Sequence, residues 1–307
     1  MWKNKLGAAQ LWAWTAVAVS APAAQFAAGS NWTGTVLTAL LCGILIWIAD
    51  RVLPENPEYG KFGGAIHWLW NSLAVSQVMG FTAGCWPEGE TTVFLPICLA
   101  LLAAASVYDG ALRGARVGAT VLWLTAILYL LVVVAAVKEI QICWLRPESP
   151  ESNPALAAGL LTIPASLALR EEKGRGAGWI AGILIFPVVI SVCVSGVLSP
   201  DRASGVNGFY ELSRSLSLLG MIKRFEALVS VAMTVGWFCL MSLLLAGAAR
   251  QSREKGFGTV SAAAAAIVLF LLDVKISAFV WILGAVGVWI LLPLALRKKA
   301  RKNENNA

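Results

Sequence analysis

Charged side chains and histidine are scarce in this chain of 307 residues. Only 13% of the residues are charged, whereas a soluble domain carries roughly 25%. The single histidine, His67, has no second histidine and no Cys-His spacing to form a metal site, so we interpret it as an interfacial or packed residue. Nothing suggests a Ser-His-Asp triad or a catalytic carboxylate pair. We therefore expect a protein that is not an enzyme and that holds no metal or cofactor.

Apolar residues make up 58% of the chain, and its mean hydropathy is +0.74. A soluble protein this apolar could not cover its surface with polar groups. The net charge of +7 does not indicate nucleic acid, because Lys and Arg lie between apolar runs and at the two ends. The fourteen tryptophans fit the aromatic belts of a bilayer protein. The sequence therefore predicts an integral membrane protein in contact with lipid.

The apolar residues fall into ten stretches, and a helix needs about 20 such residues to cross the hydrocarbon core. Charge, proline or glycine clusters bound each stretch. The predicted spans are 8–28, 31–50, 63–84, 91–108, 115–137, 154–170, 177–198, 225–249, 257–273 and 276–296. Only Asp273, Lys275 and Ser277 interrupt the run between the last two, so a re-entrant hairpin there would change the count.

The first stretch is also similar to a cleavable signal peptide, because Lys3 and Lys5 precede an apolar run that reaches small residues around 21–24. Trp12 and Gln25 in its interior favour a retained first span. We therefore expect the chain to keep this segment as a membrane helix.

The distribution of Lys and Arg predicts the orientation of these spans. Ten crossings put both termini on one side. That side then carries 17 of the 24 basic residues, including the tail at 297–307, and the other side carries 7. The excess recurs from loop to loop, so we expect a multi-pass protein of the cell membrane with both termini in the cytoplasm.

Two predicted spans carry proline and polar residues near their middle. In span one these are Ser20, Pro22 and Gln25, with Ala21 beside the proline as a further candidate, and in span six they are Thr162, Pro164 and Ser166. A proline removes a backbone hydrogen bond, and backbone groups freed in lipid must be buried in protein or line a cavity. If the protein consists of two halves of five spans each, spans one and six occupy corresponding positions. Interruptions at corresponding positions of two halves point to a transporter binding site. The alternative is a packing kink, since Pro96 and Pro187 also lie in spans.

Helical spacing adds further candidates for lining such a site. Ser230 and Thr234 are four residues apart in span eight, with Trp237 on nearly the same face. Asn71 lies in a polar part of span three that also contains Ser72, Ser76 and Gln77. Hydrogen bonds between helices are the common use of such residues and remain the alternative. A polar but mostly neutral interior suits the binding or passage of a small zwitterion better than it suits catalysis.

Two predicted external features stand outside the spans. Cys85 and Cys143 both fall at the external face, which leaves open a disulfide between them or two free thiols. In the segment 199–224, Leu216, Leu219 and Ile222 share one face at helical spacing. We expect an amphipathic helix lying on the outer surface there.

Residues 209–245, FYELSRSLSLLGMIKRFEALVSVAMTVGWFCLMSLLL, resemble the spore-germination permease family, the B subunits of nutrient germinant receptors. The Arg224-Phe225-Glu226 element, followed by a long apolar span with Trp237, carries most of the resemblance. Residues 20–48 resemble the first two spans of that family, with their very short link. This chain departs from the family in being short, with clipped loops and an Ala-rich start.

The resemblance implies the amino acid–polyamine–organocation superfamily, with an inverted repeat of five plus five helices like that of LeuT. Ten transmembrane helices, with interrupted helices one and six, would then form a single all-α membrane domain over 1–307. The first repeat would cover about 8–137 and the second about 154–296.

We therefore expect a germinant-receptor-like or permease-like protein that binds a small amino acid at mid-membrane. It would lie in the cell membrane or the spore inner membrane, with other receptor subunits as partners. A secondary amino-acid transporter coupled to H⁺ or Na⁺ is the alternative, although span five has no mid-span lysine to stand in for a cation. A structural subunit without a ligand is the third interpretation.

Overall fold

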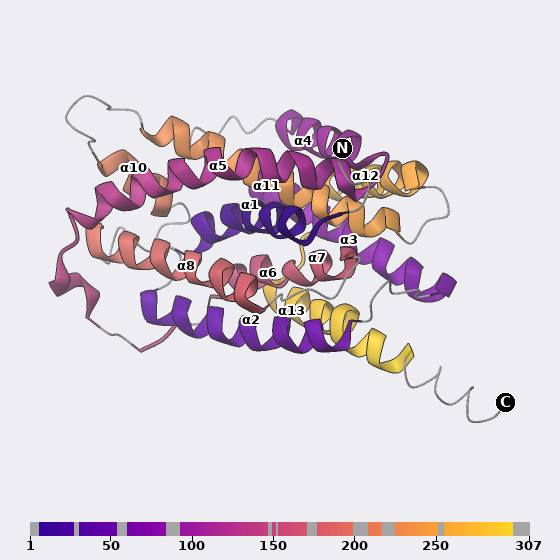
Figure 1. Cartoon of the computed structure of the whole chain (residues 1–307), viewed down its shortest axis with the longest axis horizontal. Coiled ribbons are helices and arrows are strands. Elements are labelled where there is room, and N and C mark those ends of the chain that lie inside the picture. The colour runs from indigo at the N-terminus through magenta and orange to yellow at the C-terminus, as the bar shows by residue number, and fades with distance from the viewer. Residues whose placement is uncertain are drawn as a thin grey trace.

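The computed structural model describes residues 6–27, 31–53, 60–83, 93–146, 149–151, 153–170, 177–198, 208–216, 225–250 and 255–296. Within these ranges the chain is helical and contains no strand. The elements are α1 (Ala8–Phe26), α2 (Trp32–Val52), α3 (Gly60–Ala83), α4 (Phe94–Val107), α5 (Ala111–Val137), η1 (Ile142–Leu145), α6 (Pro154–Leu160), α7 (Ile163–Leu169), α8 (Ala177–Val197), α10 (Gly208–Ser215), α11 (Phe225–Arg250), α12 (Lys255–Leu271), α13 (Ala278–Val286) and η2 (Gly287–Leu291). In Figure 1, α5, α1, α8 and α2 run side by side along the long axis.

Helices long and apolar enough to cross a bilayer occur five times in the described residues: at Trp32–Val52, Ala111–Val137, Gly178–Val197, Glu226–Arg250 and Ala278–Leu296. Three shorter apolar helices accompany them, at Phe94–Val107, Pro154–Leu169 and Gly256–Leu271. Many large apolar side chains on these helices face outward, as bilayer contact requires. These are the features of a helical membrane protein, as the composition predicted.

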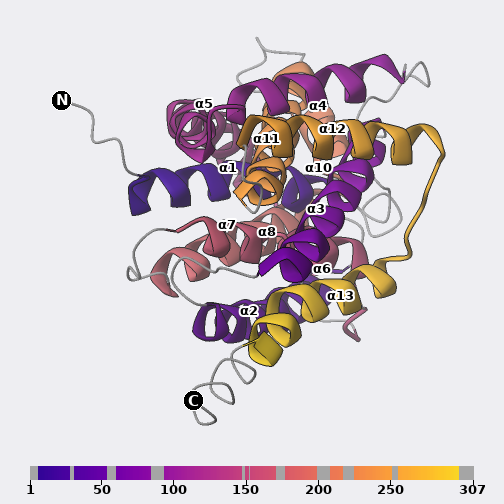
Figure 2. The same cartoon turned by 90° about the vertical axis from the view of Figure 1, so that its right-hand side faces the viewer.

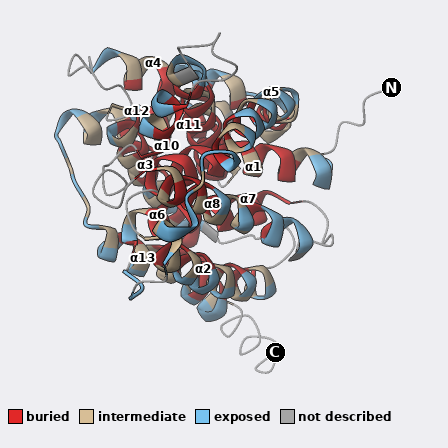
Figure 3. Cartoon of the chain, turned by 90° about the vertical axis from the view of Figure 1, so that its left-hand side faces the viewer, coloured by how far each residue is buried: buried red, intermediate tan, exposed pale blue. Residues whose placement is uncertain are grey.

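The helix α1 lies at the centre of the bundle. Fifteen of its 19 residues are buried, and it packs against α11 and α5 and also contacts α6 and α8. Figure 2 shows α4, α5 and α12 on one side of it and α2, α8 and α13 on the other. In Figure 3 the buried residues gather along α1 and α11, while the outer faces are exposed. An apolar helix without a polar face is suited to this position.

Glycines on α5, α6 and α11 allow the backbones of these helices to approach α1 closely. A Cβ at Gly118 of α5 would lie 2.7 Å from the Cα of Trp14, and one at Gly114 would lie 2.7 Å from the Trp14 ring. The spacing of these two glycines is the small-xxx-small pattern of close helix pairs in membranes. On α11, a Cβ at Gly236 would lie 2.7 Å from the Cβ of Ala21. Any larger residue would push these helices apart.

Helix one is continuous, which corrects the prediction of an interruption there. Pro22 lies inside α1 without ending it, and the helix runs on to Phe26. Helix six is broken as predicted, because α6 ends at Leu160 and α7 begins at Ile163. The Ala-rich sequence around Pro22 explains the difference, since strong helix formers on both sides tolerate one missing hydrogen bond.

The predicted boundary between the last two spans is present as a non-helical turn. Residues 272–277 separate α12 from α13, and Asp273 has φ of 50°. Gln77 of α3 holds this turn: its amide donates to the carbonyl of Val274 at 2.6 Å and its oxygen accepts from the Ile276 N–H at 3.2 Å. Gln77 thus has the interhelical role that we gave as the alternative to lining a site.

Some predicted features lie outside the described residues. Cys85, residues 217–224 of the predicted surface helix, and the basic tail at 297–307 belong to this group. Cys143 is described and is a free thiol. The short helix α10, which precedes residues 217–224, buries Phe209 and Leu212 against the bundle.

The glycine packing predicts a specific sensitivity. Gly118→Ala should lower the free energy of unfolding by about 1–3 kcal/mol, because the new methyl overlaps the backbone of Trp14. Thermal unfolding of the purified protein in detergent measures the change. The matched control is Gly80→Ala on an exposed face of α3, where no atom lies within 4 Å of the added Cβ. Equal stability of Gly118→Ala and Gly80→Ala would contradict this packing.

Candidate functional site

Two of the predicted residues of span one, Ala21 and Pro22, lie where α1 meets α6 and α11. A Cβ at Gly159 of α6 would lie 2.5 Å from the Cβ of Pro22, so this proline packs directly on the end of α6. One residue earlier, Ala21 packs on Gly236 of α11. We call this meeting point the α1–α6–α11 junction, made by Ala21, Pro22, Gly159, Thr162 and Gly236.

Asn153 ties the start of helix six to the end of helix one. Its side-chain oxygen caps α6 by accepting from the Leu156 N–H at 3.0 Å, and its amide donates to the carbonyl of Phe26 at 2.7 Å. Pro154 follows at the first helical position, where its missing N–H costs nothing. The Asn-Pro pair therefore fixes α6 beside α1. In the sequence this pair looks like the ordinary start of a helix, so it was not singled out.

The break between α6 and α7 is stabilised by side chains as well as by backbone bonds. The Thr162 hydroxyl donates to the Gly159 carbonyl at 2.6 Å, which also accepts the Thr162 N–H at 3.3 Å. The Trp281 indole of α13 donates to the Ala158 carbonyl at 3.1 Å. Backbone carbonyls that a helix break frees in a membrane need such partners. The broken segment is therefore a defined structure within the bundle.

Most of the predicted hydroxyls bond to their own helices. Ser20 donates to the Val17 carbonyl at 2.7 Å, Ser166 to the Ile163 carbonyl at 2.7 Å, and Thr234 to the Ser230 carbonyl at 2.8 Å. This local bonding satisfies the donor in a helix. Each oxygen keeps lone pairs that can accept a hydrogen bond from a ligand.

Trp237 is buried, and its ring lies against two other aromatic rings. Its ring packs edge-on against Phe26 at 6.1 Å between centroids and lies 6.0 Å from Phe81. Phe26 and Phe81 are themselves 4.9 Å apart in an edge-to-face pair. These three rings close the bundle at the end of α1 next to Gln25, which is also buried.

Asn71 is fully buried, but away from the junction. A Cβ built at Gly247 of α11 would lie 3.2 Å from the side-chain amide nitrogen of Asn71. Gly247 is eleven residues beyond Gly236 on α11, which is about 16 Å at 1.5 Å per residue. The amide of Asn71 makes no hydrogen bond with the described residues. Asn71 therefore faces the other end of α11 and is not brought together with Ser20 and Thr162.

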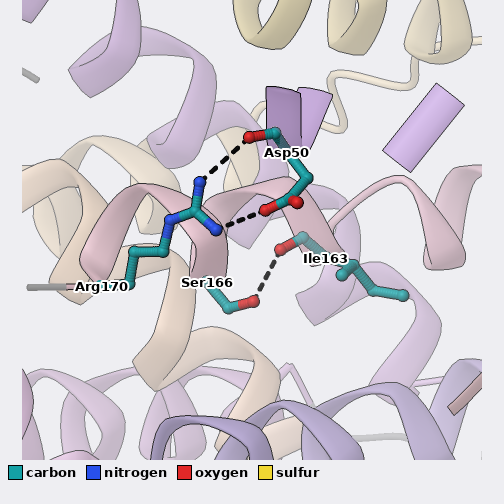
Figure 4. A network of polar contacts seen from close by, with 4 residues as sticks. All are labelled: Asp50, Ile163, Ser166 and Arg170. Atoms are coloured by element: carbon teal, nitrogen blue, oxygen red, sulfur yellow. Dashed lines mark hydrogen bonds and ion pairs between the residues drawn. The ribbon is translucent and has the colours of Figure 1, made fainter. Parts of the chain in front are cut away.

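The buried Asp50–Arg170 ion pair was missed in the sequence. Arg170 follows α7 and Asp50 lies near the end of α2, and Figure 4 shows the guanidinium contacting both the carboxylate and the carbonyl of Asp50. The second contact is 3.0 Å, and the Arg170 side chain is only 7% exposed. Arg250 of α11 donates to the carbonyl of Ala168 nearby. Two arginines thus hold the end of α7 to α2 and α11.

In the sequence, Arg170 counted only as one of the basic residues of the side predicted to be cytoplasmic, and Asp50 was not singled out. Their distinguishing signal was that opposite charges stood at the ends of spans two and six, which a parallel pair of helices brings to one side. Among the described residues, no group of three or more His, Cys, Asp or Glu side chains could hold a metal ion. His67 is buried and stacks near Trp289, with 4.9 Å between ring centroids.

Comparison of the chain with protein-family models and with curated proteins gave no match.

The ion pair leads to a double-mutant prediction. Asp50→Ala should cost about 3–5 kcal/mol of stability, because it leaves the buried Arg170 charge without its partner, and Arg170→Ala should cost less, because the Asp50 side chain is partly exposed. The double substitution should cost clearly less than the two single costs added together. Denaturant titration of the purified protein measures all three variants. The exposed pair of Asp109, in the turn before α5, and Arg113, in the first turn of α5, is the control, and removing it should cost about 0–1 kcal/mol. Additive losses at Asp50 and Arg170 would show that the pair is not coupled.

Proposed function

We propose that this chain is a permease-like or germinant-receptor-like membrane protein that binds a small amino acid at the α1–α6–α11 junction. Its ten spans would form two inverted repeats of five, with α6 and α7 together as helix six. The break between α6 and α7, packed on Pro22 at Gly159, is the observation that carries the proposal. A broken helix beside a proline-containing helix is where carriers expose backbone groups to a substrate.

The helix contacts support a twofold plan. If helices one to five correspond to helices six to ten, equivalent helices of four of the five pairs touch each other: α1 with α6, α2 with α8, α3 with α11, and α4 with α12. Other contacts have a partner under the same exchange. The α3–α12 contact corresponds to α11–α4, α1–α8 to α6–α2, and α1–α5 to α6–α13. Such pairing is expected when two repeats are related by a twofold axis.

The positions of the helix ends support an even number of crossings. Figure 1 shows α1 beginning and α13 and η2 ending toward the same end of the molecule. Arg113 and Arg116 at the start of α5 and Arg250 at the end of α11 also belong to the side that the charge distribution makes cytoplasmic. We therefore propose that both ends of the chain lie on the cytoplasmic side.

The junction offers the chemistry that a small zwitterion needs. The hydroxyl oxygen of Thr162 can accept from an ammonium group while it donates to the Gly159 carbonyl. Ligand groups can also compete for the carbonyls of Ala158 and Gly159 at the break. Because the side chains at the junction are neutral, a ligand with no net charge has the smallest desolvation cost. Binding would shift the balance between two packings of α6 and α7 against α1.

A ligand-stabilisation assay tests the binding site. We expect at least one small amino acid to raise the melting temperature of the purified protein, with about 2.7 kcal/mol of stabilisation at a concentration of 100 Kd. Thr162→Val should remove this shift, because it deletes the hydroxyl and keeps the side-chain shape. Thr120→Val is the matched control, since its hydroxyl also bonds back to its own helix but lies on an exposed face of α5. If no amino acid shifts the melting temperature, the proposal fails.

Reconstituted vesicles separate sensing from transport. We expect the protein alone in liposomes to bind its amino acid without concentrating it under an H⁺ or Na⁺ gradient. Radiolabelled uptake measures this, with empty liposomes as the control. Concentrative uptake without partner subunits would instead assign the chain to the secondary transporters.

A further inference from the structure

A lateral groove between α1, α5 and α8 is distinct from the junction. Its volume is about 480 Å³, within the range of about 300–1,000 Å³ typical of ligand pockets. The exposed side chains of Leu130, Trp179 and Ile185 stand on its rim, so it opens outward between α5 and α8. Tyr129 lies at its floor, buried between Phe186 and Phe209.

Two glycines of α8 make this space. No atom lies within 4 Å of a Cβ built at Gly178 or at Gly182, whereas the glycines that face α1 from α5 are in close contact. Both residues line the groove. The groove is therefore hollow because α8 lacks side chains there, and a larger residue would fill it without displacing the helices.

The lining of the groove is apolar apart from a few hydroxyl groups. Aliphatic and aromatic side chains of α5 and α8 supply most of it, while Ser20 and Thr125 donate their hydroxyls to carbonyls of their own helices. A groove of this kind on membrane-crossing helices faces hydrocarbon and not water. An apolar chain is the ligand that such walls accept at the lowest desolvation cost.

The end of the groove nearest the start of both helices carries interfacial and basic residues. Trp179 is the third residue of α8, and indole rings favour the headgroup level of a bilayer. Arg116 is six residues before the first lining residue of α5, Leu122, which is about 9 Å along the helix. Arg113, one turn further toward the same end, is paired with Asp109, so its charge does not add to that of Arg116. A phosphate at this level would meet positive charge while its acyl chain enters the groove.

We propose that the groove binds one anionic phospholipid, with an acyl chain between α5 and α8 and the phosphate near Arg116. This inference needs only the membrane setting and does not depend on amino-acid binding at the junction. The chain would touch α1 at Ser20, two residues before Pro22, so the lipid would support the helix that forms the junction. The site is thus a lipid site that contacts the central helix of the bundle.

Photolabelling in vesicles tests the proposal. The full protein is reconstituted in phosphatidylethanolamine and phosphatidylglycerol vesicles that contain a trace of phosphatidylglycerol with a diazirine on one acyl chain. A phosphatidylcholine probe with the same chain is used in parallel. We expect the phosphatidylglycerol probe to label peptides of α5 and α8 at least fivefold more than the phosphatidylcholine probe. Labelling should fall at least fivefold in Gly182→Leu, which fills the groove.

Gly80→Leu is the matched control, because it also adds a leucine where no atom lies within 4 Å, on the exposed face of α3. Its labelling of α5 and α8 should equal that of the unchanged protein. Gly178→Leu serves as a second blocking variant if Gly182→Leu fails to fold. Labelling that persists in the folded blocking variant, or equal labelling by the two probes, overturns the proposal. The amino-acid melting assay is a separate measurement and distinguishes failure of the lipid site from failure of the junction.

Discussion

The close approach of other helices to α1 is the constraint on which the remainder of the bundle depends. In a membrane the hydrophobic effect does not drive helices together, so association rests on van der Waals contact and hydrogen bonds. Gly118 of α5, Gly159 of α6 and Gly236 of α11 each let a helix backbone come within contact distance of α1. The Trp14 indole adds hydrogen bonds to the Cys239 carbonyl and the Ser242 hydroxyl of α11. Together these contacts position every element of the junction.

The break in helix six is the second consequence of the same environment. Lipid offers no hydrogen bonds, so a helix can be interrupted only where protein groups replace the lost backbone partners. Thr162 and Trp281 supply them at the break, and Asn153 supplies them at the start of α6. At the far end of α7, Arg170 is held by Asp50 in a buried pair. The short helix α7 is thus fixed at both ends while its junction with α6 departs from helical geometry.

The bundle contains two proposed ligand sites, the junction and the lateral groove, and they differ in physical character. The junction is tightly packed and polar only through hydroxyls and carbonyls, which is why we propose a small neutral zwitterion as its ligand. The lateral groove is open and apolar, which suits a lipid chain. Ser20 lines the groove two residues before Pro22 of the junction, so the two regions lie on different faces of α1.

The sequence by itself determined the helical membrane class, because twenty-residue apolar stretches have few other stable forms, and every predicted span range contains a helix. It also located the helix-six break, because proline and threonine there weaken the helix locally. The separation of Asn71 from the junction and the packing of Trp237 against two phenylalanine rings were decided by tertiary structure. So were the Asp50–Arg170 pair and the groove. These depend on which helices become neighbours, and that follows from the packing of small residues between helices far apart in the chain.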